Sequence, residues 1–152
     1  RGEELPYALE LSSEVFGKFV APDYPPLGIQ TFHEYIEPDA MYRRLDGGEL
    51  RFWGCFQDGG LAGIAALRND AHISLLFVRE KYQRRGIARG LVGAAIEACL
   101  AEGYAKRITV NASPYSVEAY RHLGFVGTGP EQLQDGIRFT PMEYRLVPEN
   151  NL

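Results

Sequence analysis

The sequence predicts one domain of mixed α and β structure (residues 1–152), and three observations support this class. Apolar residues recur every three or four positions between Leu5 and Phe19, as in an amphipathic helix. From Leu50 the period changes to two, which is typical of strands. Helical and strand-like segments then alternate along a chain whose 152 residues suit a single domain.

Two helices are expected in the N-terminal third, with a proline-rich loop between them. The second begins near Thr31, because the spacing between Thr31 and Glu34 is that of a capping box. Pro38 breaks or restarts this helix, since proline cannot donate a backbone hydrogen bond. Gly47–Gly48 ends it.

Three strands should follow as an antiparallel meander, over Leu50–Phe56, Leu61–Leu67 and Ala71–Val78. Turn residues separate them, at Asp58–Gly60 and at Asn69–Asp70.

The second half is predicted to alternate helices with strands. In order, we expect a well-buried helix over Gly86–Glu102 capped by Gly103, a strand over Lys106–Asn111, a helix from Ser113–Pro114 to Gly124, and final strands at Phe125 and Ile137–Leu146 joined by a hairpin around Asp135–Gly136. Serine suits an N-cap, and proline suits the first helical position. The tail at 148–152 is expected to fray.

Composition excludes several classes of function. The net charge of −4 disfavours nucleic-acid binding, and no apolar run approaches the ~20 residues of a membrane span. Cys55 and Cys99 lie in apolar segments without a metal or disulfide pattern, so we expect buried free thiols in a reducing cytoplasm. Three histidines without ligand spacing predict no metal site. A homodimer is left open.

The segment Leu75–Gly93 has the order of elements that a phosphate-binding loop requires. An apolar strand leads into an arginine-rich turn, and Gly86 then opens a helix. The start of a helix carries unpaired N–H groups and about half a positive charge, so it attracts anions. Glycine lets a phosphate approach the backbone, and Arg84, Arg85 and Arg89 can contact its oxygens.

Two common phosphate-binding motifs do not fit this segment. The Walker loop needs a lysine after the glycine, and none follows Gly86. The dinucleotide fingerprint G-x-G-x-x-G is not matched by Gly86–Gly90 either.

The stretch Gln83–Ala88 resembles the Q/R-x-x-G-x-G/A signature of the GCN5-related N-acetyltransferases, which binds the pyrophosphate of acetyl-coenzyme A. Val78 and Tyr82 match the lead-in of that family, although Glu80 replaces its proline. Ala119–Phe125 resembles the family's Y-x-x-L-G-F segment. The resemblance implies a mixed, mostly antiparallel sheet flanked by helices, in the order α-α-β-β-β-α-β-α-β-β.

The resemblance also implies which residues bind acetyl-CoA as cosubstrate. They are the loop residues Gln83, Arg84, Arg85, Gly86, Ile87, Ala88 and Arg89, the backbone amides near Phe77 and Val78, and Asn111 or Ser113, where many members carry an asparagine. In the family, the strand before the loop diverges from its neighbour, and its unpaired amides polarise the thioester carbonyl.

Tyr120 matches the family tyrosine that protonates the leaving thiolate, and a phenol is a suitable donor. His72 falls where some members carry a catalytic glutamate, and its ordinary pKa near ~6.5 suits a general base. Strand alternation puts His72 on one face with Ser74, Leu76 and Val78, opposite Ile73 and Phe77. Weaker candidates for the base are Glu80, Glu34 and His33. Nothing adjacent activates Cys55 as an acyl-carrying nucleophile.

The resulting prediction is an acetyl-CoA-dependent N-acetyltransferase that acts directly on a primary amine of a small molecule or peptide. Two alternatives stay open, a coenzyme A-binding sensor without turnover and a nucleic-acid binder with a basic loop. We expect an apolar, aromatic acceptor wall made from Tyr24, Phe32, His33, Tyr35, Trp53, Phe139 and Met142.

Overall fold

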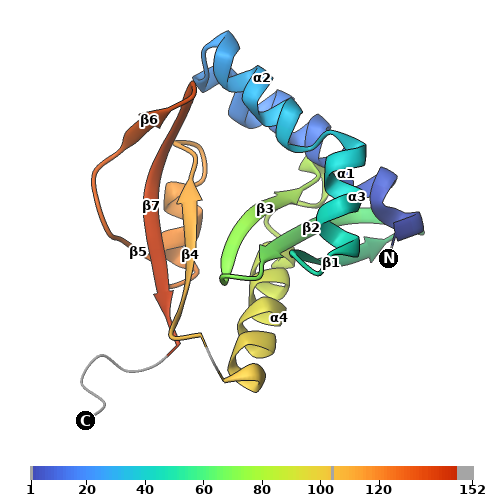
Figure 1. The fold of residues 1–152 in the computed structure, drawn as a ribbon, viewed down its shortest axis with the longest axis vertical. Coiled ribbons are helices and arrows are strands. Elements are labelled where there is room, and N and C mark those ends of the chain that lie inside the picture. The colour runs from blue at the N-terminus through green and yellow to red at the C-terminus, as the bar shows by residue number, and fades with distance from the viewer. Residues whose placement is uncertain (1, 104, 147–152) are drawn as a thin grey trace.

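The computed structural model describes residues 2–103 and 105–146 and confirms the mixed α/β architecture (Figure 1). The seven-stranded sheet has the order β1-β2-β3-β4-β7-β5, with β6 also paired to β7. Within the described residues, β3 and β4 are the one parallel pair. The strands are β1 (Leu50–Gln57), β2 (Gly60–Arg68), β3 (His72–Val78), β4 (Arg107–Ala112), β5 (Val126–Gly127), β6 (Gln132–Gln134) and β7 (Ile137–Arg145).

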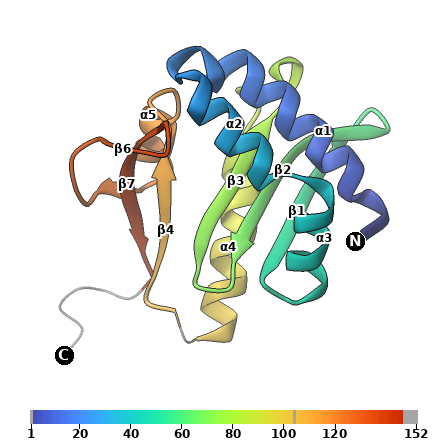
Figure 2. The same ribbon diagram turned by 45° about the horizontal axis from the view of Figure 1, so that its top comes forward.

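Helices cover both faces of the sheet (Figure 2). They are α1 (Leu5–Val15), α2 (Pro26–Tyr35), α3 (Pro38–Asp46), α4 (Ile87–Glu102) and α5 (Val117–His122). The first core cluster joins α1, α2 and α3 to one side of β1–β3, and the second joins α4 and α5 to β4 and β7. None of the described helices is long and apolar enough to cross a bilayer. The predicted frayed tail at 148–152 lies outside the described residues.

The predicted start of the second helix is wrong. α2 begins at Pro26, so Thr31 lies inside the helix, where its one hydroxyl proton is shared between Leu27 O at 2.9 Å and Asp135 O at 2.8 Å. Pro25 supplies the extended N-cap residue, and Pro26 has the fixed φ that the first helical position needs. The capping box with Glu34 therefore does not form.

A new helix, α3, begins at Pro38, as expected. The preceding Glu37 caps this helix, since its carboxylate accepts hydrogen bonds from the backbone N–H groups of Asp39 and Ala40 at 3.1 and 3.0 Å. These bonds lower the pKa of Glu37. The helix ends before Gly47, which confirms the predicted stop.

The last helix begins later than predicted. Ser113 does not cap a helix at Pro114; its hydroxyl lies 2.9 Å from that of Ser116, and Ser116 N–H donates to Ser113 O at 2.9 Å. These bonds close a turn over 114–116, so α5 starts at Val117. The following strand begins at Val126, because Phe125 N–H still donates to Tyr120 O at the end of α5, at 3.0 Å.

The two cysteines are free, as expected, but only one is buried. Cys99 on α4 faces the core, whereas Cys55 on β1 is half-buried. Burial raises the pKa of the Cys99 thiol.

An extra residue in β3 changes which way its side chains face. Ile73 pairs with Leu67 and Leu75 pairs with Ala66, so Ser74 is a bulge that has no partner in β2. Side chains alternate along a strand, and one inserted residue reverses the alternation beyond it.

The bulge makes the predicted face assignment wrong. Ile73 packs in the cluster shared with α4, whereas Phe77 packs in the cluster shared with α1 and α2. Leu76 joins the α4 side and Val78 packs against the start of α4. Hence Ile73 and Phe77 do not share a face, and His72, next to Ile73 in the chain, turns to the α2 side.

β3 separates from β4 almost as soon as the two strands meet. The strands pair only at His72 with Thr109 and at Ile73 with Val110. Beyond these pairs they diverge, as Figure 1 shows. The expected divergence is therefore confirmed, and one edge of β3 is left without a strand partner from Ser74 onward.

The gap is bridged at one end by contact between α2 and the turn before β7 (Figure 1). Gly28 meets Gly136 so closely that a Cβ on Gly28 would stand 2.1 Å from the Gly136 carbonyl oxygen. Thr31 Oγ1 donates to Asp135 O at 2.8 Å, and Tyr24 OH donates to Arg138 O at 3.3 Å. The N-terminal helices are thereby fixed to the C-terminal hairpin.

Gly28→Ala should destabilise the protein by about 1–3 kcal/mol, the usual range for overpacking, because the added methyl group collides with the backbone of Gly136. The free energy of unfolding from urea titration measures this. Gly93→Ala in α4 is the matched control, since a Cβ there meets nothing within 4 Å. It should be neutral or stabilising by roughly 0.5–1 kcal/mol. Equal effects of the two substitutions would contradict the close contact.

Candidate active site

A cavity of about 620 Å³ lies between β3 and β4, where the strands diverge. Its walls come from β3, the start of α4, the end of β4, α5 and the inner side of α1 and α2. Apolar side chains form much of the surface, and they include Val15, Phe16, Val20, Phe32, Phe77 and Ile137.

One end of the cavity is the start of α4. Gly86 is the N-cap residue with φ +82°, in the left-handed region that glycine adopts without strain. Gly90 N–H donates to Gly86 O at 3.0 Å, so the N–H groups of Ile87, Ala88 and Arg89 precede the first bond of the helix. With no side-chain cap at this end, these groups are open to an anion in the cavity.

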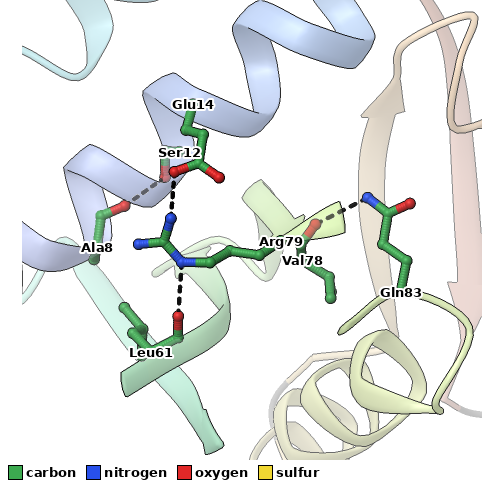
Figure 3. A network of polar contacts seen from close by, with 7 residues as sticks. All are labelled: Ala8, Ser12, Glu14, Leu61, Val78, Arg79 and Gln83. Atoms are coloured by element: carbon green, nitrogen blue, oxygen red, sulfur yellow. Dashed lines mark hydrogen bonds and ion pairs between the residues drawn. The ribbon is translucent and has the colours of Figure 1, made fainter. Parts of the chain in front are cut away.

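The loop before α4 is attached to the end of β3 by its glutamine. Gln83 Nε2 donates to Val78 O at 2.9 Å (Figure 3). The next residue after the strand, Arg79, donates from Nε to Leu61 O at 2.9 Å and pairs with Glu14 on α1. The end of β3 is therefore held from both sides, which fixes the position of the loop.

The cavity wall is positively charged. Arg84 and Arg89 line it beside the start of α4, and Arg68 lines it at the other end. Among the described residues of the wall, none is aspartate or glutamate. Arg85 is outside the wall; its guanidinium lies 5.5 Å from the centre of the Tyr82 ring. The net charge of the chain is negative, but the charge of this cavity is not.

The open edge of β3 presents backbone donors to the cavity. Arg79 N–H donates to Ala62 O on β2 at 2.8 Å. Because N–H groups alternate sides along a strand, Phe77 N–H also faces β2, whereas Val78 N–H and Leu76 N–H face the open edge. Phe77 lines the cavity with its side chain instead.

Tyr120 on α5 lines the cavity from the opposite wall and is 5% exposed. Its ring meets Phe125 edge to face at 5.2 Å, which fixes its orientation. Burial raises the pKa of the phenol above its ordinary value of 10.0, so Tyr120 is protonated at neutral pH. It is a hydrogen-bond donor in an apolar wall.

His72 lines the cavity at the end away from α4. Its Nδ1 lies 2.7 Å from Thr109 Oγ1, a contact that spans the short parallel pairing. Burial lowers the pKa of His72 below its ordinary value of 6.5, and the neighbouring Arg68 lowers it further, while Asp70 opposes this. The imidazole is therefore neutral at pH 7 and keeps a lone pair on one nitrogen.

The comparison with known families agrees with this geometry. Residues 20–146 match the family described as the acetyltransferase (GNAT) domain. The chain belongs to the GNAT superfamily. No protein with a curated description is similar enough to match it.

Solved GNAT structures share the fold at low identity. An N-acetyltransferase from Rhodopseudomonas palustris is 22% identical, with 94% of this chain and 90% of that chain covered and a TM-score of 0.80. The PaiA N-acetyltransferase of Thermoplasma acidophilum, solved with coenzyme A, is 20% identical, with 95% and 94% covered and a TM-score of 0.75. The ribosomal-protein-S18-alanine N-acetyltransferase of Escherichia coli is 21% identical, with 100% and 94% covered and a TM-score of 0.64.

The structure brings most of the predicted GNAT site residues to one cavity. All of them line it except Arg85. The two candidates for an amide-like contact to coenzyme, Asn111 and Ser113, both line it, although the Ser113 hydroxyl is already engaged with Ser116. Among the weaker base candidates, Glu80, Glu34 and His33 lie outside the wall, as does Cys55.

The predicted acceptor wall is only partly correct. Tyr24, Phe32 and Tyr35 line the cavity, whereas His33, Trp53, Phe139 and Met142 do not. Met142 is fully buried in the core beneath α4 and α5, so it packs rather than binds.

Arg68, Ser74 and Thr109 at this site were not predicted from the sequence. Arg68 pairs with His72 across the turn between β2 and β3. Pairing the two predicted strands outward from this turn would have placed Arg68 opposite His72. Ser74 could not be recognised as a bulge from alternation. No group of acidic, histidine or cysteine side chains suited to a metal occurs in the described part of this GNAT chain.

Proposed function

We propose that this GNAT protein transfers the acetyl group of acetyl-CoA to a primary amine by direct attack. One observation carries the proposal: a single cavity joins the unpaired start of α4 to Tyr120 and His72 along the open edge of β3. The coenzyme complex of the similar PaiA N-acetyltransferase supports acetyl-CoA as the donor.

The residues present fit the coenzyme. The pyrophosphate would accept hydrogen bonds from the amides of Ile87, Ala88 and Arg89, with Arg84 and Arg89 adding charge. The pantetheine arm carries amides, which would pair with the exposed edge of β3. Val78 N–H or Leu76 N–H would then donate to the thioester carbonyl as negative charge develops on its oxygen.

Two protein groups accept and supply the protons that move during acetyl transfer. The amine nitrogen forms a bond to the thioester carbon, and the bond from that carbon to sulfur breaks. His72 takes the proton that the amine loses, directly or through a water. Tyr120 donates a hydrogen bond to the departing sulfur and supplies its proton. Burial raises the pKa of the phenol, but a thiolate formed beside it is desolvated as well, which keeps the two basicities comparable.

Gly86→Asp should weaken acetyl-CoA binding at least tenfold, because a carboxylate would stand at the pyrophosphate position. Gly86→Asn is the matched control: aspartate and asparagine have similar size and both tolerate the positive φ of this position, so they differ mainly in charge. We expect at least a tenfold larger dissociation constant for the aspartate variant than for the asparagine variant, measured by calorimetric titration. Equal affinities would contradict the anion site and the proposed function.

Tyr120→Phe should lower kcat by roughly 10²-fold, the low end of a general-acid contribution, with little change in the dissociation constant of acetyl-CoA. Thiol release from acetyl-CoA, screened over amines, amino acids and peptides, provides the assay. Tyr144→Phe is the control, since Tyr144 also packs on Phe125 but lies outside the cavity wall. If the Tyr120 variant turns over at the wild-type rate, Tyr120 is not the general acid and serves only to pack the core. If coenzyme binds but no acceptor is acetylated, the sensor alternative would be favoured.

His72 should set a limb in the pH profile of kcat/KM. The neutral imidazole is the base, so the rate should rise with pH and level off above a pKa that lies below 6.5. In His72→Gln the base is lost and only neutral amine reacts. For this variant, kcat/KM should therefore keep rising with pH until the pH reaches the pKa of the acceptor amine. A profile that is the same in both proteins would exclude His72 as the base.

A further inference from the structure

The end of the cavity around His72 contains polar groups that the proposed transfer chemistry does not use. They are Arg68 at the end of β2, Tyr35 at the end of α2 and Ser74 in β3, and all three line the cavity. If His72 is the base, the acceptor amine must lie at this end of the cavity.

Two of these groups lack a partner although they are buried. The hydroxyl oxygens of Tyr35 and Ser74 are inaccessible to solvent and make no hydrogen bond within the described residues. A buried polar atom without a partner is destabilising, so such atoms are rare outside places where a ligand or water completes them. The Tyr35 ring itself is fixed, since the Arg44 guanidinium lies 4.3 Å from its centre.

Arg68 has one edge occupied and one edge available. Its Nε and Nη2 atoms pair with the two carboxylate oxygens of Asp70 at 3.2 and 2.8 Å. Guanidinium has a second edge, formed by Nη1 and the other proton of Nη2, which can pair with another carboxylate in the same planar way. The Asp70 side chain is 57% exposed and lies outside the cavity wall, so it orients Arg68 without closing the cavity to an anion.

The charge of the cavity selects against cationic acceptors. Arg68, Arg84 and Arg89 are in the wall, and none of its described residues is acidic. A polyamine or another multiply charged cation would find no carboxylate there to replace its hydration, which is a large energetic penalty. A single negative charge, in contrast, would meet the available edge of Arg68.

We propose that the acceptor is an amine that also carries a carboxylate, held by the available edge of Arg68. Arg68 and His72 are directly opposed across β2 and β3, so their side chains share a face. An amine near His72 is then only a few bonds from a carboxylate on Arg68, the spacing of an α-amino acid. Phe16, Phe32 and Ile137 in the wall favour an apolar or aromatic side chain.

This inference rests on the acetyl transfer proposed above, and its test separates the two. The probes are L-phenylalanine and L-phenylalaninamide as acceptors, which differ in the carboxylate. Because their amines also differ in basicity, each variant is compared with wild type on the same acceptor. Arg68→Gln should raise KM for phenylalanine roughly 10- to 100-fold, the range for a lost charged hydrogen bond, and should change KM for the amide little. Arg68→Lys should give a KM for phenylalanine between those of wild type and Arg68→Gln, since lysine keeps the charge and loses the planar guanidinium.

Arg107→Gln is the matched control for these variants. Arg107 is likewise an arginine at the end of a strand, paired with a carboxylate on Glu143, but it lies outside the cavity wall. Both kinetic constants should match wild type on both acceptors. A loss of activity that is equal for phenylalanine and its amide in Arg68→Gln would overturn the inference.

Product binding tests the inference without turnover. Wild type should bind N-acetyl-L-phenylalanine at least tenfold more tightly than its carboxamide, and Arg68→Gln should remove the difference, as measured by calorimetry. Equal binding of the two by wild type, or acetylation of an aminoglycoside with a kcat/KM as high as that of any amino acid, would overturn it. Carboxylate-specific binding in a protein that does not bind acetyl-CoA would instead contradict the proposed function and leave the carboxylate site standing.

Discussion

The separation of β3 from β4 is the constraint on which the candidate site depends. Two residue pairs hold these strands together, and the bulge at Ser74 follows at once. A strand edge that loses its neighbour inside a protein leaves N–H and C=O groups unpaired, which is unfavourable unless something else satisfies them. Here that edge forms a wall of the cavity, so the groups that the sheet does not use face the cavity. The contact of Gly28 with Gly136 then fixes the two sides of the opening at one end.

Local charge decides what this opening can hold, and it differs in sign from the net charge. The chain carries 20 acidic and 16 basic residues, yet the described wall of the cavity has arginines at both ends and no carboxylate. Charges on the outer surface are screened over about 8–10 Å by salt, whereas those beside a partly closed apolar cavity act through a lower dielectric. Net charge is therefore a sound argument against nucleic-acid binding over the whole surface, but it says little about the ligand of one cavity.

The sequence predicted those features that depend on local chemistry. Gly86 and Gly103 were recognised at the ends of α4, and both adopt the positive φ that favours glycine. The segment Leu75–Gly93 was recognised because a strand, arginines, a glycine and a helix start follow one another as a phosphate site requires, and the loop Gln83–Ala88 within it was recognised by its resemblance to the GNAT signature. Two predicted helix caps failed because each side chain has a different hydrogen-bond partner. The Thr31 hydroxyl contacts Leu27 O and Asp135 O instead of capping a helix that begins at Thr31, and Ser113 bonds to Ser116 in a turn instead of capping a helix at Pro114.

The bulge shows how far one such feature reaches. Alternation placed His72 and Val78 on the same face, but the extra residue turns His72 toward α2 while Val78 packs against the start of α4. One seven-residue strand can therefore serve both substrates of the proposed reaction. The coenzyme phosphates would bind on the α4 side at its end, and the acceptor would bind on the α2 side at its start, beside Arg68 and His72. Without the extra residue at Ser74, the side chains of His72 and Val78 would lie on the same face of the sheet. The two ends of β3 could then not contribute to binding sites on opposite faces.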